Sequence, residues 1–147
     1  MRAPRVRTLR QMVSLVGKLR RRGCRISFTN GCFDLLHPGH VRVLQEAKRL
    51  GDILIVGLNS DASVRRIKGP GRPVLPASAR AELLSALSCV DYIVIFRGPT
   101  PIPLLKVLKP DVLVKGGDYT PEEVVGADVV RSYGGRVVVA PLAEGDR

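Results

Sequence analysis

Aromatic residues and cysteines are scarce in this sequence, and their scarcity argues against several classes of protein. Aromatic residues make up 4% of the 147 residues and tryptophan is absent. Single-stranded nucleic acids are commonly held on stacked aromatic side chains, so this shortage argues against such a surface. Cys24, Cys32 and Cys89 are an odd number without a CxxC pair, which suggests neither a disulfide framework nor a zinc site. Free thiols fit a reducing compartment, and we therefore expect a cytoplasmic protein.

Long apolar runs are also missing from the sequence. None approaches the roughly 20 residues that a membrane-spanning helix requires. The basic N-terminus, MRAPRVRTLRQMV, is not followed by the continuous apolar stretch of a secretory signal. We therefore expect no association with a membrane. Hydrophobic residues still make up 45% of the chain, which is a globular composition, and the length suits one domain with a single core.

Acidic residues are few compared with basic ones. The sequence has 24 Lys and Arg against 13 Asp and Glu, a formal net charge of +11. This excess favours anionic partners such as nucleotides, sugar phosphates or nucleic acids, although a solvated basic surface explains it equally well. The cluster of Lys18 and Arg20–Arg22 lies at the end of a predicted helix, where the helix dipole favours positive charge. We expect no specific function with nucleic acids.

Short β-branched runs alternate with helical patterns along the chain. We predict strands over 25–30, 52–59, 91–96, 111–115 and 136–141, and helices over 38–50, 76–88, 102–108 and 121–133. Because the strands are apolar throughout, they belong in a parallel sheet that is covered on both faces. Right-handed crossovers then predict an α/β fold, a Rossmann-like doubly wound sheet of five parallel strands in the order 3-2-1-4-5.

An amphipathic helix precedes the first strand. Its predicted apolar face consists of Leu9, Met12, Val13, Val16 and Leu19, and Gly23 follows as a stop. We therefore divide the chain into an N-terminal helix, residues 1–24, and a main domain, residues 25–147.

Both histidines of the chain lie in GCFDLLHPGH, directly after the first predicted strand. Pro38 suits the first position of a helix, which puts His37 at the cap and His40 one turn in. Residues three apart share a helix face, so both rings should meet the free N–H groups at the helix start. Two such donors suit the α-phosphate of a nucleotide and need no covalent nucleophile. A Pro-Gly turn with two incidental histidines is the alternative.

The segment TNGCFDLLHPGH resembles the signature of the HxGH nucleotidyltransferase superfamily, the cytidylyltransferase-like group, and the resemblance extends from Arg25 onward. VGLNSDASVRRIKGPGRPV and DVLVKGGDYTPEEVVGADVVRSYGG resemble the bacterial D-glycero-β-D-manno-heptose 1-phosphate adenylyltransferases in their stand-alone form. The resemblance implies that ATP, with Mg²⁺, reacts with this sugar 1-phosphate to give pyrophosphate and ADP-heptose for surface glycans such as lipopolysaccharide. It is also compatible with a homodimer.

Three alternatives to this function stay open. Glycerol-3-phosphate cytidylyltransferase and FAD synthetase are alternatives within the superfamily. A basic module that binds nucleic acid without catalysis is an alternative of another class. Pyrophosphate release that requires a nucleotide and a sugar phosphate favours an enzyme, whereas salt-dependent retention of DNA without turnover favours the module.

Position and resemblance together give three sets of candidate site residues. The catalytic set is His37, His40 and Lys68. The nucleotide-binding set is Thr29, Asn30, Gly31, Cys32, Phe33, Arg80, Gly116, Gly117 and Asp118. The set for the second substrate is Asp34, Asn59, Asp61 and Arg72, and we expect no residue to serve as a metal ligand.

The resemblance gives several of these residues their roles. It implies that Lys68 and Arg72, in a mobile basic loop over 68–73, close over the β- and γ-phosphates, and that Arg80 faces phosphate. A solvated loop is the alternative for Arg72, and a helix cap is the alternative for Asp61. Similar proteins also continue into a final helix that begins with a Ser/Thr-Thr run. The printed sequence stops at PLAEGDR, before such a helix. A truncated protein and a tail beyond the printed residues are the two alternatives, and we favour the tail.

Overall fold

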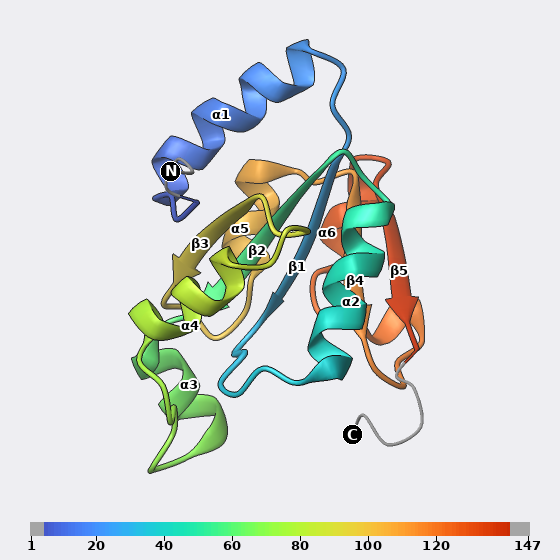
Figure 1. Cartoon of the computed structure of the whole chain (residues 1–147). Coiled ribbons are helices and arrows are strands. Elements are labelled where there is room, and N and C mark those ends of the chain that lie inside the picture. Colours follow the sequence, from blue (N-terminus) through green and yellow to red (C-terminus); the bar gives the residue numbers. More distant parts are fainter. Residues whose placement is uncertain (1–4, 142–147) are drawn as a thin grey trace.

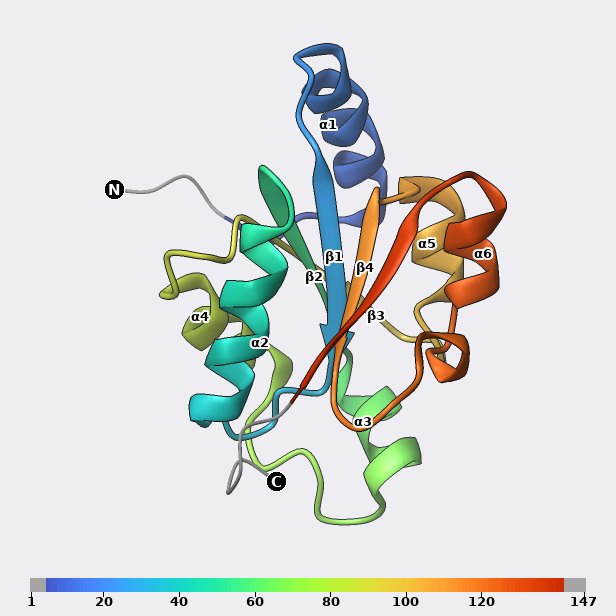
Figure 2. The same ribbon diagram turned by 90° about the vertical axis from the view of Figure 1, so that its right-hand side faces the viewer.

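The computed structural model describes residues 5–141, which form one parallel sheet with helices on both faces (Figures 1 and 2). The strands are β1 (Ile26–Gly31), β2 (Ile53–Asn59), β3 (Tyr92–Phe96), β4 (Val112–Gly116) and β5 (Arg136–Ala140). The helices are α1 (Leu9–Arg21), α2 (Pro38–Arg49), α3 (Asp61–Lys68), α4 (Ala77–Ser85), α5 (Ile102–Leu108), the 3-10 turn η1 (Pro121–Glu123) and α6 (Ala127–Ser132). The strand order is β3-β2-β1-β4-β5 and all neighbours are parallel, so the predicted fold class and order are confirmed.

Two hydrophobic clusters cover the two faces of the sheet. Helices α2 and α4 lie on one face, and α1, α5 and α6 lie on the other (Figure 2). Along β4, Leu113 packs into the cluster under α1, α5 and α6, whereas Val112 and Val114 pack into the cluster under α2 and α4. Successive side chains of a strand point to opposite faces, so this alternation fixes the side on which each strand-end residue lies.

Aspartates that precede two strands help to fix the sheet at its amino edge. The carboxylate of Asp91, before β3, accepts a hydrogen bond from the backbone N–H of Leu54 at 2.8 Å. The carboxylate of Asp111, before β4, accepts one from the N–H of Ile26, also at 2.8 Å. These bonds satisfy donors that would otherwise be unpaired where the strands begin. No helix within residues 5–141 is long and apolar enough to cross a bilayer.

Helix α1 shares the core of the main sheet. Met12, Val16 and Leu19 are buried in the same cluster as α5 and α6. Val13, which we predicted on this apolar face, is instead 42% exposed, because the buried stripe of α1 is narrower than expected. Helix α1 therefore contributes to the same core as the main domain. The predicted lack of a final helix concerns the chain from residue 142 on, outside the described residues.

Helix α3 was not predicted, and Lys68 ends this helix instead of beginning a loop. The helix escapes a search for apolar periodicity because Val64 is its one buried large apolar residue. The sequence does contain a start signal for this helix, one residue before Asp61, which we considered as a cap. Ser60 is the N-cap and its hydroxyl accepts a hydrogen bond from Ser63 N at 3.2 Å, whereas Asp61 is the first helical residue.

The predicted single helix over 121–133 was wrong. The 3-10 turn η1 ends at Glu123, Val124 is extended, and α6 begins only at Ala127. Gly126 separates the two with φ +93°, a conformation that glycine adopts most easily. A Cβ atom on Gly126 would lie 2.4 Å from Leu105 Cδ1, so space as well as backbone geometry requires glycine here.

Helix α4 is shorter than the predicted helix over 76–88, since it ends at Ser85. Leu83 is 45% exposed, whereas Arg80, Ala81 and Leu84 are buried. The buried arginine takes the place that an apolar side chain would be expected to fill.

Candidate active site

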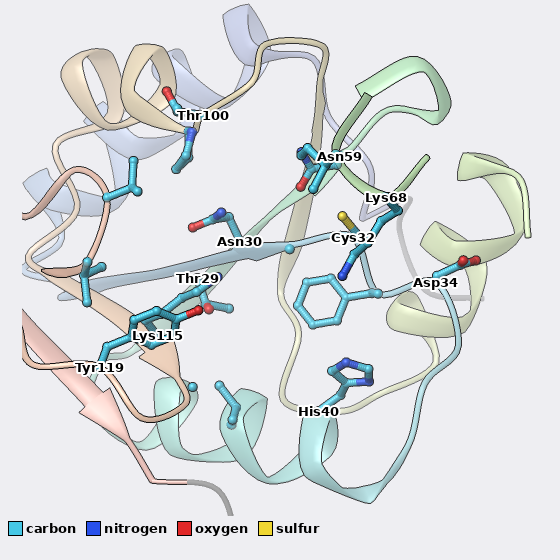
Figure 3. Close-up of a pocket in the computed structure, with 18 of the residues that line it drawn as sticks. Thr29, Asn30, Cys32, Asp34, His40, Asn59, Lys68, Thr100, Lys115 and Tyr119 are labelled. Carbon is cyan, nitrogen blue, oxygen red and sulfur yellow. The ribbon is translucent and has the colours of Figure 1, made fainter. Parts of the chain in front are cut away.

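A cavity of about 770 Å³ opens at the carboxyl edge of the sheet, where the strands end (Figure 3). It brings together most of the predicted site residues: Thr29, Asn30, Gly31, Cys32, Phe33, Asp34, His37, His40, Asn59, Lys68, Arg72 and Gly116. Four others, Asp61, Arg80, Gly117 and Asp118, are not among its lining residues. Ligands of open α/β sheets bind at this edge, and the cavity is therefore the candidate active site.

The two histidines stand together at the start of α2, as predicted. His37 is the N-cap, Pro38 is the first helical residue, and the centroids of the His37 and His40 rings are 3.8 Å apart. His37 Nδ1 accepts a hydrogen bond from Gly39 N at 3.1 Å, and His40 Nδ1 accepts one from His37 N at 3.2 Å. A neutral ring that accepts at Nδ1 carries its hydrogen on Nε2. Both rings can therefore donate to an anion in the cavity.

The surroundings of His40 favour its neutral form. Burial lowers its pKa, and the neighbouring His37 and Lys68 lower it further. The Phe33 ring supports His40 in an edge-on contact with 5.4 Å between ring centroids. Phe33 has φ +46°, which is uncommon for a bulky residue, and a Cβ on Gly31 would lie 3.0 Å from its ring. Gly31 thus leaves room for the aromatic ring that braces His40.

Two lysines face the cavity, and neither has a partner within residues 5–141. Lys68 ends α3 and Lys115 lies near the end of β4. Neither ammonium group has a hydrogen bond or an ion pair to residues 5–141. Burial lowers the pKa of Lys115, the Cys32 thiol opposes this effect, and Lys68 lowers the pKa further. The cavity is therefore a positively charged site with unused donors.

Arg80 is used within the protein, not in the cavity. Its side chain is fully buried, and its guanidinium donates to the carbonyl oxygens of Cys32 and Asn59 at 2.8 Å each and of Leu75 at 3.0 Å. It also forms an ion pair of 2.7 Å with Asp61. The group joins the ends of β1 and β2 to α3. Arg80 and Asp61 thus position the strand ends from outside the cavity lining, and their predicted ligand contacts stay predictions.

Asp34 holds the loop that follows α3. Its carboxylate accepts hydrogen bonds from Arg72 Nη1 at 2.8 Å, from Val74 N at 2.8 Å and from Leu75 N at 3.1 Å. Desolvation opposes the ionised form, but these hydrogen bonds together with the Arg72 charge outweigh it and lower the pKa of Asp34. Asp34 and Arg72 line the cavity, yet each already has a partner.

The two glycines at the end of β4 have different roles, since Gly116 lines the cavity and Gly117 forms a turn. Gly116 lies so close to α2 that a Cβ on it would meet Val43 Cγ2 at 2.5 Å. Gly117 has φ +138° and turns the chain away. The predicted nucleotide contact of Gly116 is compatible with its place in the lining, whereas Gly117 and Asp118 lie outside it.

Sequence reasoning missed several residues of the lining. They are Leu35, Val43, Ile67, Phe96, Pro99, Thr100, Pro101, Lys115, Tyr119, Glu123, Val124 and Val125. Glu123 belongs to the capping box at the start of η1, since its carboxylate accepts hydrogen bonds from Thr120 N and Oγ1 at 3.0 and 2.9 Å. Lys115 carried a usable signal, because it is a charged residue that directly follows the apolar run of a buried strand.

Comparisons with known proteins show the family to which the sequence is similar. The sequence model of the cytidylyltransferase-like family matches residues 28–140. The bifunctional protein HldE of Syntrophotalea carbinolica is 63% identical over 126 residues, which are 86% of this chain and 26% of that protein. The protein of the same name from Geobacter metallireducens is 56% identical over 141 residues, 96% of this chain and 29% of that protein. The chain thus spans about a quarter of the length of these curated relatives.

Solved structures share the fold. A lipopolysaccharide core biosynthesis protein from Thermoplasma volcanium superposes with a TM-score of 0.67 at 27% identity, covering 84% of this chain and all of that one. A pantoate-β-alanine ligase from Francisella tularensis superposes with a TM-score of 0.68 at 16% identity, covering 98% of this chain and 69% of that one. The second likeness shows the fold alone.

Proposed function

Because the chain belongs to the cytidylyltransferase-like family, we propose that it transfers the adenylyl group of ATP to D-glycero-β-D-manno-heptose 1-phosphate. The observation that carries this proposal is the stacked histidine pair at the start of α2, with both Nδ1 atoms bonded to backbone N–H groups. The high identity to the HldE proteins and the structural likeness to a lipopolysaccharide core biosynthesis protein support the choice of sugar. The three unpaired cysteines support a reducing, cytoplasmic compartment.

The reaction needs positioning and charge stabilisation but no covalent intermediate. A phosphate oxygen of the sugar 1-phosphate attacks the α-phosphorus of ATP, and the bond from that phosphorus to the bridging oxygen breaks. Pyrophosphate leaves, and a new diphosphate bond joins sugar and nucleotide. His37 and His40 donate hydrogen bonds from Nε2 to oxygens on which negative charge grows, and Lys68 neutralises the departing phosphates.

Mg²⁺ would enter this site as part of the Mg·ATP substrate. Residues 5–141 contain no group of three or more His, Cys, Asp or Glu side chains placed to hold a metal ion. The carboxylates of Asp34 and Glu123 in the cavity lining already accept hydrogen bonds from other residues. Mg²⁺ is often held largely by substrate phosphates and water, so we assign no residue of this chain as its ligand.

A matrix of substrates tests the function. Pyrophosphate release is measured with each of four nucleoside triphosphates against heptose 1-phosphate, glycerol 3-phosphate and FMN. We expect release only when a nucleotide and an acceptor are both present, fastest with ATP and heptose 1-phosphate. Equal or faster release with CTP and glycerol 3-phosphate would move the chain to the cytidylyl branch, and release with ATP and FMN would indicate FAD synthesis.

A further inference from the structure

The sheet edge divides the cavity into two halves. The α2 half contains His37, His40 and Gly116, which packs against Val43 of α2. On the opposite face, the η1 half is formed by Asn30, Asn59, Phe96 and Lys115 from the strand ends, with Thr100 from the segment before α5 and Glu123 from the end of η1. The side of Lys115 follows from alternation in β4: Val114 packs under α2, so Lys115 points with Leu113 to the other face.

The two lysines differ in their effect on His40. His37 and Lys68 lower the pKa of His40, whereas Lys115 is not among the groups that do so, and Lys68 therefore acts on the α2 half. Both lysines lower the pKa of the Cys32 thiol at the end of β1, Lys68 more than Lys115, so the two halves meet there. Figure 3 shows this arrangement, with Lys115 and Tyr119 on one side of the view and Lys68 and His40 on the other.

The η1 half contains polar groups that suit a phosphorylated polyol. Lys115 is half-buried and has no acidic partner among residues 5–141, and the carboxylate of Glu123 is already used by Thr120. The half-buried Asn30 also lacks a side-chain hydrogen bond to the described residues, so its amide can meet a hydroxyl group. A half-buried cation without a counter-ion is costly unless an anionic ligand provides one.

We propose that the η1 half is the acceptor site and that Lys115 binds the phosphate of the sugar 1-phosphate. This inference rests on the proposed function. Nucleotidyl transfer needs two anionic substrates to meet at one phosphorus, and the two halves meet at the end of β1. Lys68 then serves the triphosphate, and Lys115 serves the attacking phosphate. Asn30 lies beside Lys115 on the same face of the sheet and contacts the sugar.

Initial rates of pyrophosphate release separate the two lysines. In Lys115→Gln we expect the KM for heptose 1-phosphate to rise about 10- to 100-fold, as for a lost charge-assisted contact, while the KM for ATP stays within about twofold. Lys115→Arg should recover most of the loss. The matched control is Lys106→Gln on the exposed surface of α5, which should behave like the wild type. An unchanged acceptor KM, or an equal rise in both KM values, overturns the proposal.

Equilibrium binding keeps the proposal testable without turnover. Calorimetric titration with heptose 1-phosphate alone should show about 10- to 100-fold weaker binding to Lys115→Gln than to the wild type, and free heptose should bind both proteins equally weakly. Equal binding of the sugar phosphate, or no binding to the wild type, overturns the role of Lys115. A wild type that binds the sugar phosphate through Lys115 but releases no pyrophosphate contradicts the proposed function alone.

Discussion

The arginines and lysines in and beside the cavity have opposite places in the structure. Arg80 is buried and donates four hydrogen bonds within the protein, and Arg72 is paired with Asp34. Lys68 and Lys115 have no such partner among residues 5–141. The planar guanidinium group suits several fixed acceptors at once, whereas a lysine keeps a mobile charge. The comparison teaches that the arginines build the cavity and the lysines remain available for ligands.

The largest expected effect concerns the building role of Arg80. Arg80→Met should lower the free energy of unfolding by about 3–5 kcal/mol, because it leaves buried carbonyl oxygens and Asp61 without their partner. Urea unfolding measures this change. The control is Arg10→Met on the exposed surface of α1, which should change stability by less than about 0.5 kcal/mol. A stable Arg80→Met protein that has lost only ATP affinity would show that Arg80 is a ligand-binding residue after all.

The next effect belongs to the histidines, which use Nδ1 for structure and Nε2 for chemistry. His40→Ala should lower kcat by about two to three orders of magnitude, as for a lost transition-state donor, with a much smaller effect on ATP binding. His40→Gln is the matched control, because glutamine at this helix position can keep the cap. Thermal unfolding should therefore recover in His40→Gln while kcat stays low. Turnover near the wild-type value in His40→Ala would contradict the assignment.

Lys68 should show a smaller effect, on binding instead of stability. Lys68→Met should raise the KM for ATP about 10- to 100-fold through the loss of a charge-assisted contact. The unfolding free energy should change little, since the ammonium has no partner to lose among residues 5–141. Steady-state kinetics and urea unfolding check the two parts, with Lys106→Met as the control. A clear loss of stability in Lys68→Met would remove the distinction between the lysines and the arginines.

The smallest effect is the pH dependence of the Asp34 contact. The pKa of Asp34 is lowered in the folded protein, so its ionised form adds stability above about pH 4, and this stability is lost as the pH falls through the folded-state pKa. Asp34→Asn should cost about 1 kcal/mol at pH 7, since Arg72 is half-exposed. The difference from the wild type should shrink between pH 4 and pH 2 in urea unfolding. A difference that stays constant over this range would exclude the ionised contact.

The sequence predicts the sheet and the histidine site well because their signals are local. Apolar runs mark the strands, and Pro38 fixes where α2 begins, which places His37 and His40. The role of Arg80 could not be predicted from the sequence. Its hydrogen-bond acceptors are the carbonyl oxygens of Cys32, Asn59 and Leu75, which only the fold brings together. Lys115 could have been found by extending the alternation of β4 by one residue.

The central claim is that the acceptor phosphate attacks the α-phosphorus beside the histidine pair, and ³¹P NMR tests it most directly. Wild-type protein is mixed with ATP, Mg²⁺ and heptose 1-phosphate. We predict that the signals of both substrates decline together while a diphosphate ester and free pyrophosphate grow in equal amounts. The appearance of ADP with a doubly phosphorylated sugar would show attack at the γ-phosphorus and contradict the account, as would AMP and pyrophosphate formed without the sugar phosphate.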